Sequence, residues 1–243
     1  MTNPVAIVTG GSRGIGAAIV EQLAKDGFDI VLSYARNAQA AEETADKVRA
    51  LGRKALAVKA DGSSVAGNKA VIAETVKEFG RLDTLVCNAG IYPYGPIDEM
   101  SVEQIEQVLN LNVRGVMVET AEAVKHMKKG GRLIFIGSAF GARAPFPGIS
   151  LYAATKAALR GFTQGVARDL GPKGITVNVV EPGPIDTDLN PATGEGAKVI
   201  SSFVATGAYG TVDDIANMVS FLASPKAGYI TGAALPVDGG LEA

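Results

Sequence analysis

A tyrosine and a lysine four residues apart are the side chains of this sequence best placed for proton chemistry. Tyr152 and Lys156 lie at the start of a segment with helical periodicity, which puts both on one helix face with Cβ atoms about 5–6 Å apart. An ammonium beside a phenol stabilises the phenolate and is expected to lower the phenol pKa. Such a tyrosine can give a proton to a carbonyl oxygen or take one from an alcohol. Taken alone, however, the same spacing is common in structural helices.

A serine elsewhere in the chain gives this pair a context. Ser138 directly follows the apolar segment Leu133–Gly137, which has the composition of a buried strand. Ligands of open parallel sheets bind beyond the carboxyl ends of the strands. The Ser138 hydroxyl could therefore hold a substrate oxygen next to Tyr152, although a serine in such a place could equally cap a turn.

Short apolar segments alternate with segments of helical periodicity along the whole chain. Strands are expected at Val5–Thr9, Asp29–Tyr34, Ala55–Lys59, Thr84–Asn88, Arg132–Gly137, Thr176–Val180 and Ala234–Val237. Helices are expected at Ile15–Lys25, Ala38–Leu51, Lys69–Phe79, Ile105–Met127, Tyr152–Leu170 and Val212–Ala223. Strands that are apolar throughout indicate burial on both faces. The pattern predicts an α/β fold of Rossmann type, a doubly wound parallel sheet of about seven strands with helices on both faces, in one domain of residues 1–243.

The first strand–helix connection is rich in glycine. It reads Gly10-Gly11-Ser12-Arg13-Gly14-Ile15-Gly16. Glycine lets the backbone turn sharply and approach a diphosphate, and the helix that follows offers unpaired N–H groups and the positive end of its dipole to that anion. Any tight strand–helix turn can use glycine, but the position in the first such turn of an alternating chain favours a dinucleotide. The expected cofactor contacts here are Gly10, Ser12, Arg13, Gly14, Ile15 and Gly16.

The end of the second expected strand indicates which dinucleotide is bound. An NAD-selective site usually places a carboxylate there to bind the ribose hydroxyls, but no acidic residue follows Tyr34 until Glu42. Arg36, helped by Arg13 and Ser12, could instead pair with a 2′-phosphate, because a guanidinium matches phosphate geometry. The alternative is that Arg36 is a solvated loop arginine. The sequence favours NADP(H) over NAD(H), with Tyr34 and Arg36 at the ribose.

The stretch of residues 184–210 departs from the strand–helix alternation. It is rich in Gly, Pro, Ser, Thr and Asn and has only a weak helical patch around Ala197–Val204. Connections of this length inside a domain are usually binding loops, so a substrate loop is predicted here; the alternative is a floppy surface insertion. Together with Ile91–Pro96 and Phe140–Ile149, this loop is expected to surround an apolar substrate site with few charges.

Charge and composition exclude several classes of partner. The formal net charge is −2 and no basic run occurs, which argues against nucleic acid and anionic membranes as partners. No apolar run approaches the ~20 residues that span a bilayer. The one cysteine, Cys87, excludes an intrachain disulfide and is expected to be a packing residue; the one histidine, His126, is expected at the surface with no metal site around it. The chain is therefore expected to be a cytoplasmic protein with a small-molecule substrate.

Six motifs follow one another in an order and at separations that match a known family. They are Thr9–Gly16, Asn88-Ala89-Gly90, Asn112, Ser138, Tyr152 with Lys156, and Pro182-Gly183, and the ending Val237-Asp238-Gly239-Gly240 is a further match. Over essentially the whole chain, this pattern resembles the classical short-chain dehydrogenase/reductase family. Two departures are Cys87, where the family usually has asparagine, and Tyr209, where many relatives carry arginine.

The resemblance implies a role for each of these residues. Asn112, Ser138, Tyr152 and Lys156 would form a catalytic tetrad. Tyr152 would be the acid/base, Ser138 would polarise the substrate carbonyl, and Lys156 would bind the nicotinamide ribose and lower the tyrosine pKa. Asn112, through a main-chain distortion in its helix, would hold a water that links Lys156 to bulk proton supply. The other cofactor contacts would be Asp61 and Gly62 at the adenine, Asn88, Ala89 and Gly90 along the cleft, and Pro182, Gly183, Ile185 and Thr187 near the nicotinamide.

Two competing functions follow from the resemblance. The first is an NADPH-dependent carbonyl reductase, similar to 3-oxoacyl-(acyl carrier protein) reductases and general ketoreductases. In it, the pro-S hydride would attack the carbonyl carbon of a ketone, diketone or 3-oxoacyl compound. The second is a non-catalytic regulator that reuses the fold to bind a nucleotide or cyclic dinucleotide, as one relative with a similar Pro-Gly-Pro-Ile-Asp-Thr-Asp loop does. The intact set of Asn, Ser, Tyr and Lys favours the enzyme.

The resemblance also bears on macromolecular partners. An acyl carrier is acidic and would require a basic patch beside the site, for which Arg143 is the candidate. The family implies a homo-oligomer, usually a tetramer, built through the helices near Val113–Met127 and Tyr152–Leu170. Small residues in the second of these helices permit close helix approach, namely Ala153, Ala154, Ala157, Ala158 and Gly161.

Overall fold

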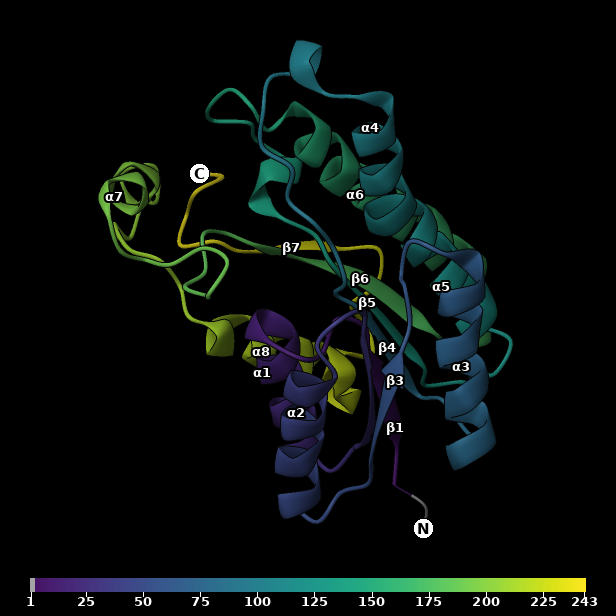
Figure 1. The fold of residues 1–243 in the computed structure, drawn as a ribbon. Helices are drawn as coiled ribbons and strands as arrows, with labels where there is room; N and C mark the ends of the chain where they lie inside the picture. The colour runs from purple at the N-terminus through teal and green to yellow at the C-terminus, as the bar shows by residue number, and fades with distance from the viewer. Residues whose placement is uncertain (1–2) are drawn as a thin grey trace.

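A computed structural model describes residues 3–243 as a seven-stranded sheet between two layers of helices (Figure 1). Every strand pair is parallel, and the order across the sheet is β3-β2-β1-β4-β5-β6-β7. The strands are β1 (Val5–Val8), β2 (Asp29–Tyr34), β3 (Ala55–Lys59), β4 (Thr84–Cys87), β5 (Arg132–Ile136), β6 (Thr176–Pro182) and β7 (Ala234–Val237). Parallel strands need long crossover connections, which explains the helices between them in the sequence.

Helices cover both faces of this sheet (Figure 1). One layer consists of α1 (Gly14–Lys25), α2 (Ala38–Ala50) and α8 (Val212–Ala223). The other consists of α3 (Val65–Phe79), α4 (Val102–Leu109), α5 (Val116–Ala123) and α6 (Ser150–Leu170), while α7 (Glu195–Ser201) stands apart in the connection after β6. Among residues 3–243, no helix combines the length and the apolar character needed to cross a membrane.

Strand side chains point alternately into two cores. In β1, Ala6 and Val8 belong to the core under α1, α2 and α8, whereas Ile7 belongs to the core under α3, α5 and α6. All three are fully buried. Burial on both faces requires apolar residues at every strand position, and this confirms the prediction of a doubly wound parallel sheet.

The strand order reverses at β1, which pairs with β2 on one side and β4 on the other. Ligands of this architecture bind outside the carboxyl ends of the strands at such a reversal. The glycine-rich turn follows β1 there, Asn88 follows β4, and Ser138 lies just beyond β5. The topology therefore brings together three motifs that are far apart in the sequence.

Several observed elements differ from their predicted bounds, and two of these differences lie near the site. The helix expected over Ile105–Met127 is interrupted by a π-helix at Asn110–Gly115, between α4 and α5. A single π-turn hardly disturbs the apolar periodicity, so the sequence pattern does not show it. β6 extends past the expected end at Val180, because Glu181 and Pro182 pair with β7.

Residues 184–210, predicted to be a substrate loop, leave the sheet after β6 and return to the same place. The N–H of Asp186 donates to the carbonyl of Gly210, and the N–H of Gly210 donates to the carbonyl of Pro184, both at 2.9 Å. The weak helical patch expected in this loop is α7, and Val204 beyond it is buried. These contacts argue against a floppy insertion.

Candidate active site

The turn after β1 is shaped by glycines that leave no room for side chains. Gly10 and Gly14 have φ angles of 65° and 52°, in the left-handed region that glycine adopts without strain. A Cβ on Gly16 would collide with the carbonyl of Gly10 and with the side-chain amide of Asn88. The turn is therefore made of closely packed backbone, and α1 starts within it.

The N-terminus of α1 has the properties of an anion site. Its N-cap residue, Arg13, makes no side-chain capping hydrogen bond, and the first turn holds no acidic residue. The first N–H groups of a helix have no intrahelical acceptor and carry the positive end of the dipole. They fit the diphosphate of a dinucleotide. Ile15 contributes backbone to this site, because its side chain packs against the core.

Asn88 and Thr9 hold the glycine turn in place. Asn88 Nδ2 donates to the carbonyls of Thr9 and Gly10 at 2.9 and 3.2 Å. The N–H groups of Asn88 and Ala89 donate to Thr9 Oγ1 at 3.1 and 3.2 Å. The structure thus joins the motif after β4 to the motif after β1, and Asn88 acts on the turn itself.

The expected ribose and adenine contacts lie at the ends of β2 and β3. The Ser63 hydroxyl and N–H both donate to Asp61 Oδ1, at 2.7 and 2.9 Å, and these bonds lower the pKa of Asp61. The Arg36 guanidinium is close enough to lower it further. Arg36 is exposed and Tyr34 is half-buried. The structure therefore brings Arg36 and Asp61 to one end of the site, as expected for residues around an adenosine.

Tyr152, Ser138 and Lys156 meet at the carboxyl end of β5. Ser138 lies close enough to Tyr152 to lower the pKa of its phenol, and Lys156 Nζ lies 5.5 Å from the centroid of the Tyr152 ring. The buried Lys156 Nζ donates to the carbonyl of Ile136 at 2.8 Å. Ser138 Oγ also accepts the N–H of Phe140 at 3.2 Å. Ser138 therefore both caps a turn and contacts the tyrosine, so its two sequence-based interpretations are compatible.

The pKa of Tyr152 is raised to about 12, mainly by burial. Ser138 opposes this increase and the neighbouring Tyr92 adds to it. The expectation of a lowered phenol pKa is wrong for this structure, because burial raises it; burial also lowers the pKa of Lys156 to about 8. A phenol with a raised pKa is protonated at neutral pH, which is the form that can donate to a carbonyl oxygen.

Asn112 lies near Lys156, inside the π-helix. Its Oδ1 accepts the N–H of Ile91 at 3.0 Å, and its Nδ2 donates to the Ile91 carbonyl at 2.9 Å. Nδ2 also reaches Thr155 Oγ1 at 3.3 Å, and that hydroxyl donates to the Tyr152 carbonyl at 2.7 Å. The main-chain distortion that the family resemblance implies is present at Asn112. Sequence analysis did not identify Thr155 as a site residue, although its position between Tyr152 and Lys156 could have indicated it.

Aromatic side chains of three connections form two groups of ring contacts, one of which includes Tyr152. Tyr92 meets the Tyr152 ring edge-on with centroids 4.8 Å apart, and a second exposed tyrosine lies 6.5 Å from Tyr92. Three phenylalanines form a chain with centroid separations of 5.3 and 6.4 Å. The five rings of this aromatic wall are Tyr92, Tyr94, Phe140, Phe146 and Phe203. They come from the three segments expected to surround the substrate, whose individual rings sequence reasoning did not identify.

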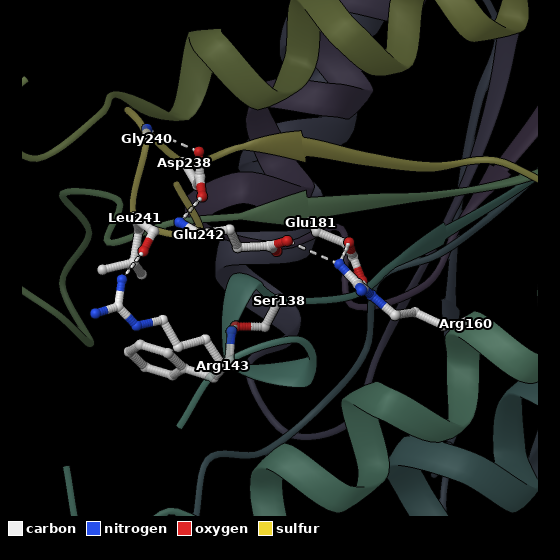
Figure 2. A network of polar contacts seen from close by, with 9 residues as sticks. Ser138, Arg143, Arg160, Glu181, Asp238, Gly240, Leu241 and Glu242 are labelled. Carbon is white, nitrogen blue, oxygen red and sulfur yellow. Dashed lines mark hydrogen bonds and ion pairs between the residues drawn. The ribbon is translucent and has the colours of Figure 1, made fainter. Parts of the chain in front are cut away.

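The nearest arginine to the aromatic wall is engaged by the end of the chain. Arg143 Nη1 donates to the carbonyl of Leu241 at 2.9 Å (Figure 2). Across the substrate loop, the Tyr209 hydroxyl donates to Asn190 Oδ1 at 3.4 Å, and burial raises its pKa. The polar side chains of Arg143 and Tyr209 therefore stabilise the loops in which they lie.

The residues after β6 connect the glycine turn, where the cofactor is expected, with the expected substrate site. Thr187 lies against Gly14 of the glycine turn, and Gly183 packs against the backbone of Asp238. Ile185 is buried in the core under α1 and α8. The structure thus places Pro182, Gly183, Ile185 and Thr187 at the same edge of the sheet as the glycine turn.

Groups outside the site agree with their expected structural roles. Cys87 is buried, and burial, followed by the nearby Glu119, raises its thiol pKa; such a thiol is inert. Burial raises the pKa of Glu119 to about 7. His126 is exposed. In residues 3–243 no group of three or more His, Cys, Asp or Glu could hold a metal ion.

Comparison with known proteins finds relatives along the whole chain. Residues 10–242 match the family model described as enoyl-(acyl carrier protein) reductase. The cyclic-di-GMP-binding biofilm dispersal mediator protein of Escherichia coli is 40% identical over 242 residues, which are 100% of this chain and 98% of the relative. Hydroxynaphthalene reductase arp2 of Aspergillus fumigatus is 37% identical over 246 residues, 96% of this chain and 90% of the relative. A solved short chain dehydrogenase from Burkholderia cenocepacia, in complex with NADP, is 46% identical with a TM-score of 0.97 and covers 99% of this chain and 98% of its own.

Proposed function

Because the chain belongs to the classical short-chain dehydrogenase/reductase family, we propose that it reduces a carbonyl compound to an alcohol with NADPH. One observation carries the proposal: Ser138, Tyr152 and the buried Lys156 lie together at the carboxyl end of β5, with Ser138 close enough to Tyr152 to lower its pKa and Lys156 Nζ 5.5 Å from the centroid of its ring. This is an acid, a second hydroxyl and a cation at the end of one strand. The NADP held by the Burkholderia relative supports NADP(H) over NAD(H) as the cofactor.

The residues of the cofactor side fit NADP(H). The uncapped N-terminus of α1 would receive the diphosphate, and the exposed Arg13 and Arg36 offer guanidinium groups to the 2′-phosphate. Lys156 would bind the nicotinamide ribose, next to Tyr152. When bound, the nicotinamide supplies a hydride to the carbonyl carbon.

The proton comes from Tyr152. Its phenol is protonated at neutral pH because its pKa is about 12, and it donates its proton to the carbonyl oxygen as negative charge develops there. Ser138 donates a hydrogen bond to the same oxygen and polarises the carbonyl. Lys156, an ammonium below a pH of about 8, stabilises the phenolate left behind. Asn112, which lies near Lys156, would connect it to bulk proton supply.

The aromatic wall favours ketones and diketones that carry planar apolar groups. Aromatic rings bind other rings through edge-to-face and offset contacts, and Tyr92 of this wall meets Tyr152 edge-on. An acidic acyl carrier is a weaker candidate partner, because the candidate for a basic patch beside the site is a single arginine, Arg143. The name of the Aspergillus relative, a hydroxynaphthalene reductase, supports a substrate with fused aromatic rings.

A substrate panel tests this proposal. The protein is mixed with NADPH and aromatic ketones, aliphatic ketones, diketones or acetoacetyl thioesters, and the loss of NADPH absorbance is followed. Aromatic ketones and diketones are expected to give the highest kcat/KM. Absence of turnover with every carbonyl compound would refute the enzyme, and highest kcat/KM with an acyl thioester would refute the aromatic preference.

A cyclic dinucleotide receptor is the second candidate, favoured by the name of the Escherichia coli relative. The exposed Arg13 and Arg36 could pair with phosphodiester groups as well as with a 2′-phosphate. Calorimetric titration with cyclic-di-GMP, with and without saturating NADPH, separates the two. Tight binding that NADPH abolishes, in a protein without carbonyl turnover, would establish the receptor instead of the enzyme.

A homo-oligomer formed through α5 and α6 is also part of the proposal. Small residues are exposed along α6, including Ala154, Ala157 and Gly161, and Met117 is exposed on α5. Light scattering is expected to give a mass that is a multiple of the chain mass. Gly161→Arg is expected to reduce that mass, whereas Ala50→Arg on the exposed end of α2 leaves it unchanged.

A further inference from the structure

The end of the chain, residues 238–243, lies near Ser138, as Figure 2 shows, and packs against the substrate loop. We call this segment the clasp. Its Leu241 is 1% exposed and packs against Ala139 and Val204, with Phe140 beside them. Ala139 directly follows Ser138, and Val204 belongs to the substrate loop. One leucine side chain therefore joins the two segments that flank the substrate side.

Close backbone packing joins the clasp to the substrate loop. The N–H of Thr206 donates to the carbonyl of Gly239 at 3.0 Å. A Cβ on Gly239 would lie 2.7 Å from side-chain atoms of Val204 and Thr206, and one on Gly240 would lie 2.7 Å from Ala205. The two glycines of the Asp-Gly-Gly ending, with φ of 63° and 83°, thus allow the chain end to lie directly on the loop.

Ion pairs and hydrogen bonds fix the other side of the clasp (Figure 2). Arg160 on α6 pairs with Glu181, and with Glu242 of the clasp at 2.9 Å. Glu181 is fully buried immediately before Pro182, where removal of its partner would leave an isolated charge. Asp238 accepts two backbone N–H groups of the clasp at 2.8 Å each. The clasp is therefore anchored to α6 and β6.

The cluster around Leu241 is separate from the two cores of the sheet. Small clusters under loops open at a lower free energy than the main core of a protein. Loss of the Leu241 side chain should therefore loosen the substrate loop while the sheet and the glycine turn remain in place.

We propose that Leu241 is a positioning residue, which sets the substrate loop against the Ser138 turn, and that the Arg160–Glu242 ion pair holds it in place. The kinetic part of this inference rests on the proposed function, since it needs a carbonyl substrate. The mechanical part does not, because attachment of the loop can be measured without turnover. The Kd for NADPH should change less than the ketone KM, because the clasp packs against residues 204–206 of the loop rather than against Ile185 and Thr187.

Leu241→Ala tests the inference on the full chain. The KM for an aromatic ketone is expected to rise about tenfold, which corresponds to roughly 1.4 kcal/mol, with a smaller change in the Kd for NADPH. Trypsin should cleave after the exposed Lys198 of α7 faster than in the parent protein. Leu241→Met keeps an apolar side chain of similar size, so its ketone KM and its rate of cleavage at Lys198 should equal those of the parent protein. Leu23→Ala, which removes a fully buried leucine of α1, is the matched control and should lower stability without either change.

Each outcome bears on the inference. An unchanged ketone KM together with unchanged cleavage at Lys198 in Leu241→Ala would overturn it, and so would an equal effect in Leu23→Ala. Faster cleavage in a protein that reduces no carbonyl compound would support the clasp and count against the proposed function. Glu242→Gln retains the Arg160–Glu181 pair. It should raise the ketone KM and the rate of cleavage at Lys198, each by less than Leu241→Ala does. This variant replaces Leu241→Ala as the test if Leu241→Ala does not fold.

Discussion

The cofactor side and the substrate side of this site are built from different parts of the polypeptide. The cofactor side is a turn of backbone, in which Gly10 and Gly14 have positive φ and Gly16 admits no side chain. The substrate side is built from side chains of separate connections, and some of these are widely exposed, such as Tyr94 at 66% and Leu189 at 75%. A site formed by the main chain allows few residue types at each position, whereas a wall of side chains can be formed by many different residue types. The identity of the cofactor can therefore be predicted from the sequence, whereas the identity of the substrate cannot.

The Tyr152 hydroxyl lies where the two sides meet, and its removal should have the largest effect. In Tyr152→Phe, kcat for carbonyl reduction is expected to fall about 10³-fold, within the range that a general acid contributes. The Kd for NADPH, measured by fluorescence titration, should change little. Tyr229→Phe, at a fully exposed tyrosine, is the matched control. Retention of full turnover in Tyr152→Phe would mean that another group donates the proton.

A methyl group in the glycine turn should damage the cofactor side alone. In Gly16→Ala the new Cβ meets the Gly10 carbonyl, and the KM for NADPH is expected to rise about a hundredfold, or roughly 2.7 kcal/mol. Gly165→Ala on α6, where a Cβ meets nothing within 4 Å, should instead stabilise the helix by roughly 0.5–1 kcal/mol. Equal NADPH kinetics in both variants would show that the turn does not hold the cofactor.

Charge reversal at the ribose end tests which dinucleotide is selected. Arg36→Asp is expected to lower the preference for NADPH over NADH about 10–100-fold, because a hydrogen bond to a charged group contributes about 1.5–3 kcal/mol. The measurement is kcat/KM with each cofactor. Arg168→Asp, at another exposed arginine, should leave the ratio unchanged. An unaltered preference in Arg36→Asp would assign the 2′-phosphate to other residues.

The pH dependence of reduction should report Lys156. Its pKa is about 8, so its ammonium is present below that pH and lost above it, while Tyr152 with a pKa of about 12 stays protonated over the same range. Because the ammonium stabilises the phenolate that forms, kcat/KM should be level below pH 8 and fall about tenfold per unit well above it. Lys156→Arg should move the decline to higher pH. A rate that rises through pH 8 would contradict this assignment.

The smallest effect is expected on the substrate side, where many side chains share the contact. Phe203→Ala removes one ring of the aromatic wall and should raise the KM for an aromatic ketone about fivefold, since an aromatic pair contributes about 0.5–1.5 kcal/mol. The KM values for NADPH and for a small aliphatic ketone are the controls and should not change. A similar increase for the aliphatic ketone would indicate a general loss of loop structure.

Several features of this protein follow from its sequence alone. Uniformly apolar strands between amphipathic helices predict the doubly wound sheet, and the glycines after β1 predict the phosphate-binding turn, because both are local requirements of the backbone. Tyr152 and Lys156 are a pair by helical spacing, and Ser138 is near them by its place after a buried strand. Each of these depends on residues close in sequence or on the general geometry of parallel sheets.

Other features were decided only by the tertiary structure. Burial raises the pKa of Tyr152 where spacing to Lys156 predicts the reverse, and burial depends on every element packed around the phenol. The aromatic wall and the contact of Leu241 with Ala139 each join segments that are far apart in the sequence. Such contacts leave no periodic pattern in the sequence, because the residue type of either partner could change while that of the other stays the same. Sequence alone therefore predicts the catalytic residues and the cofactor, and packing decides how the substrate side is held.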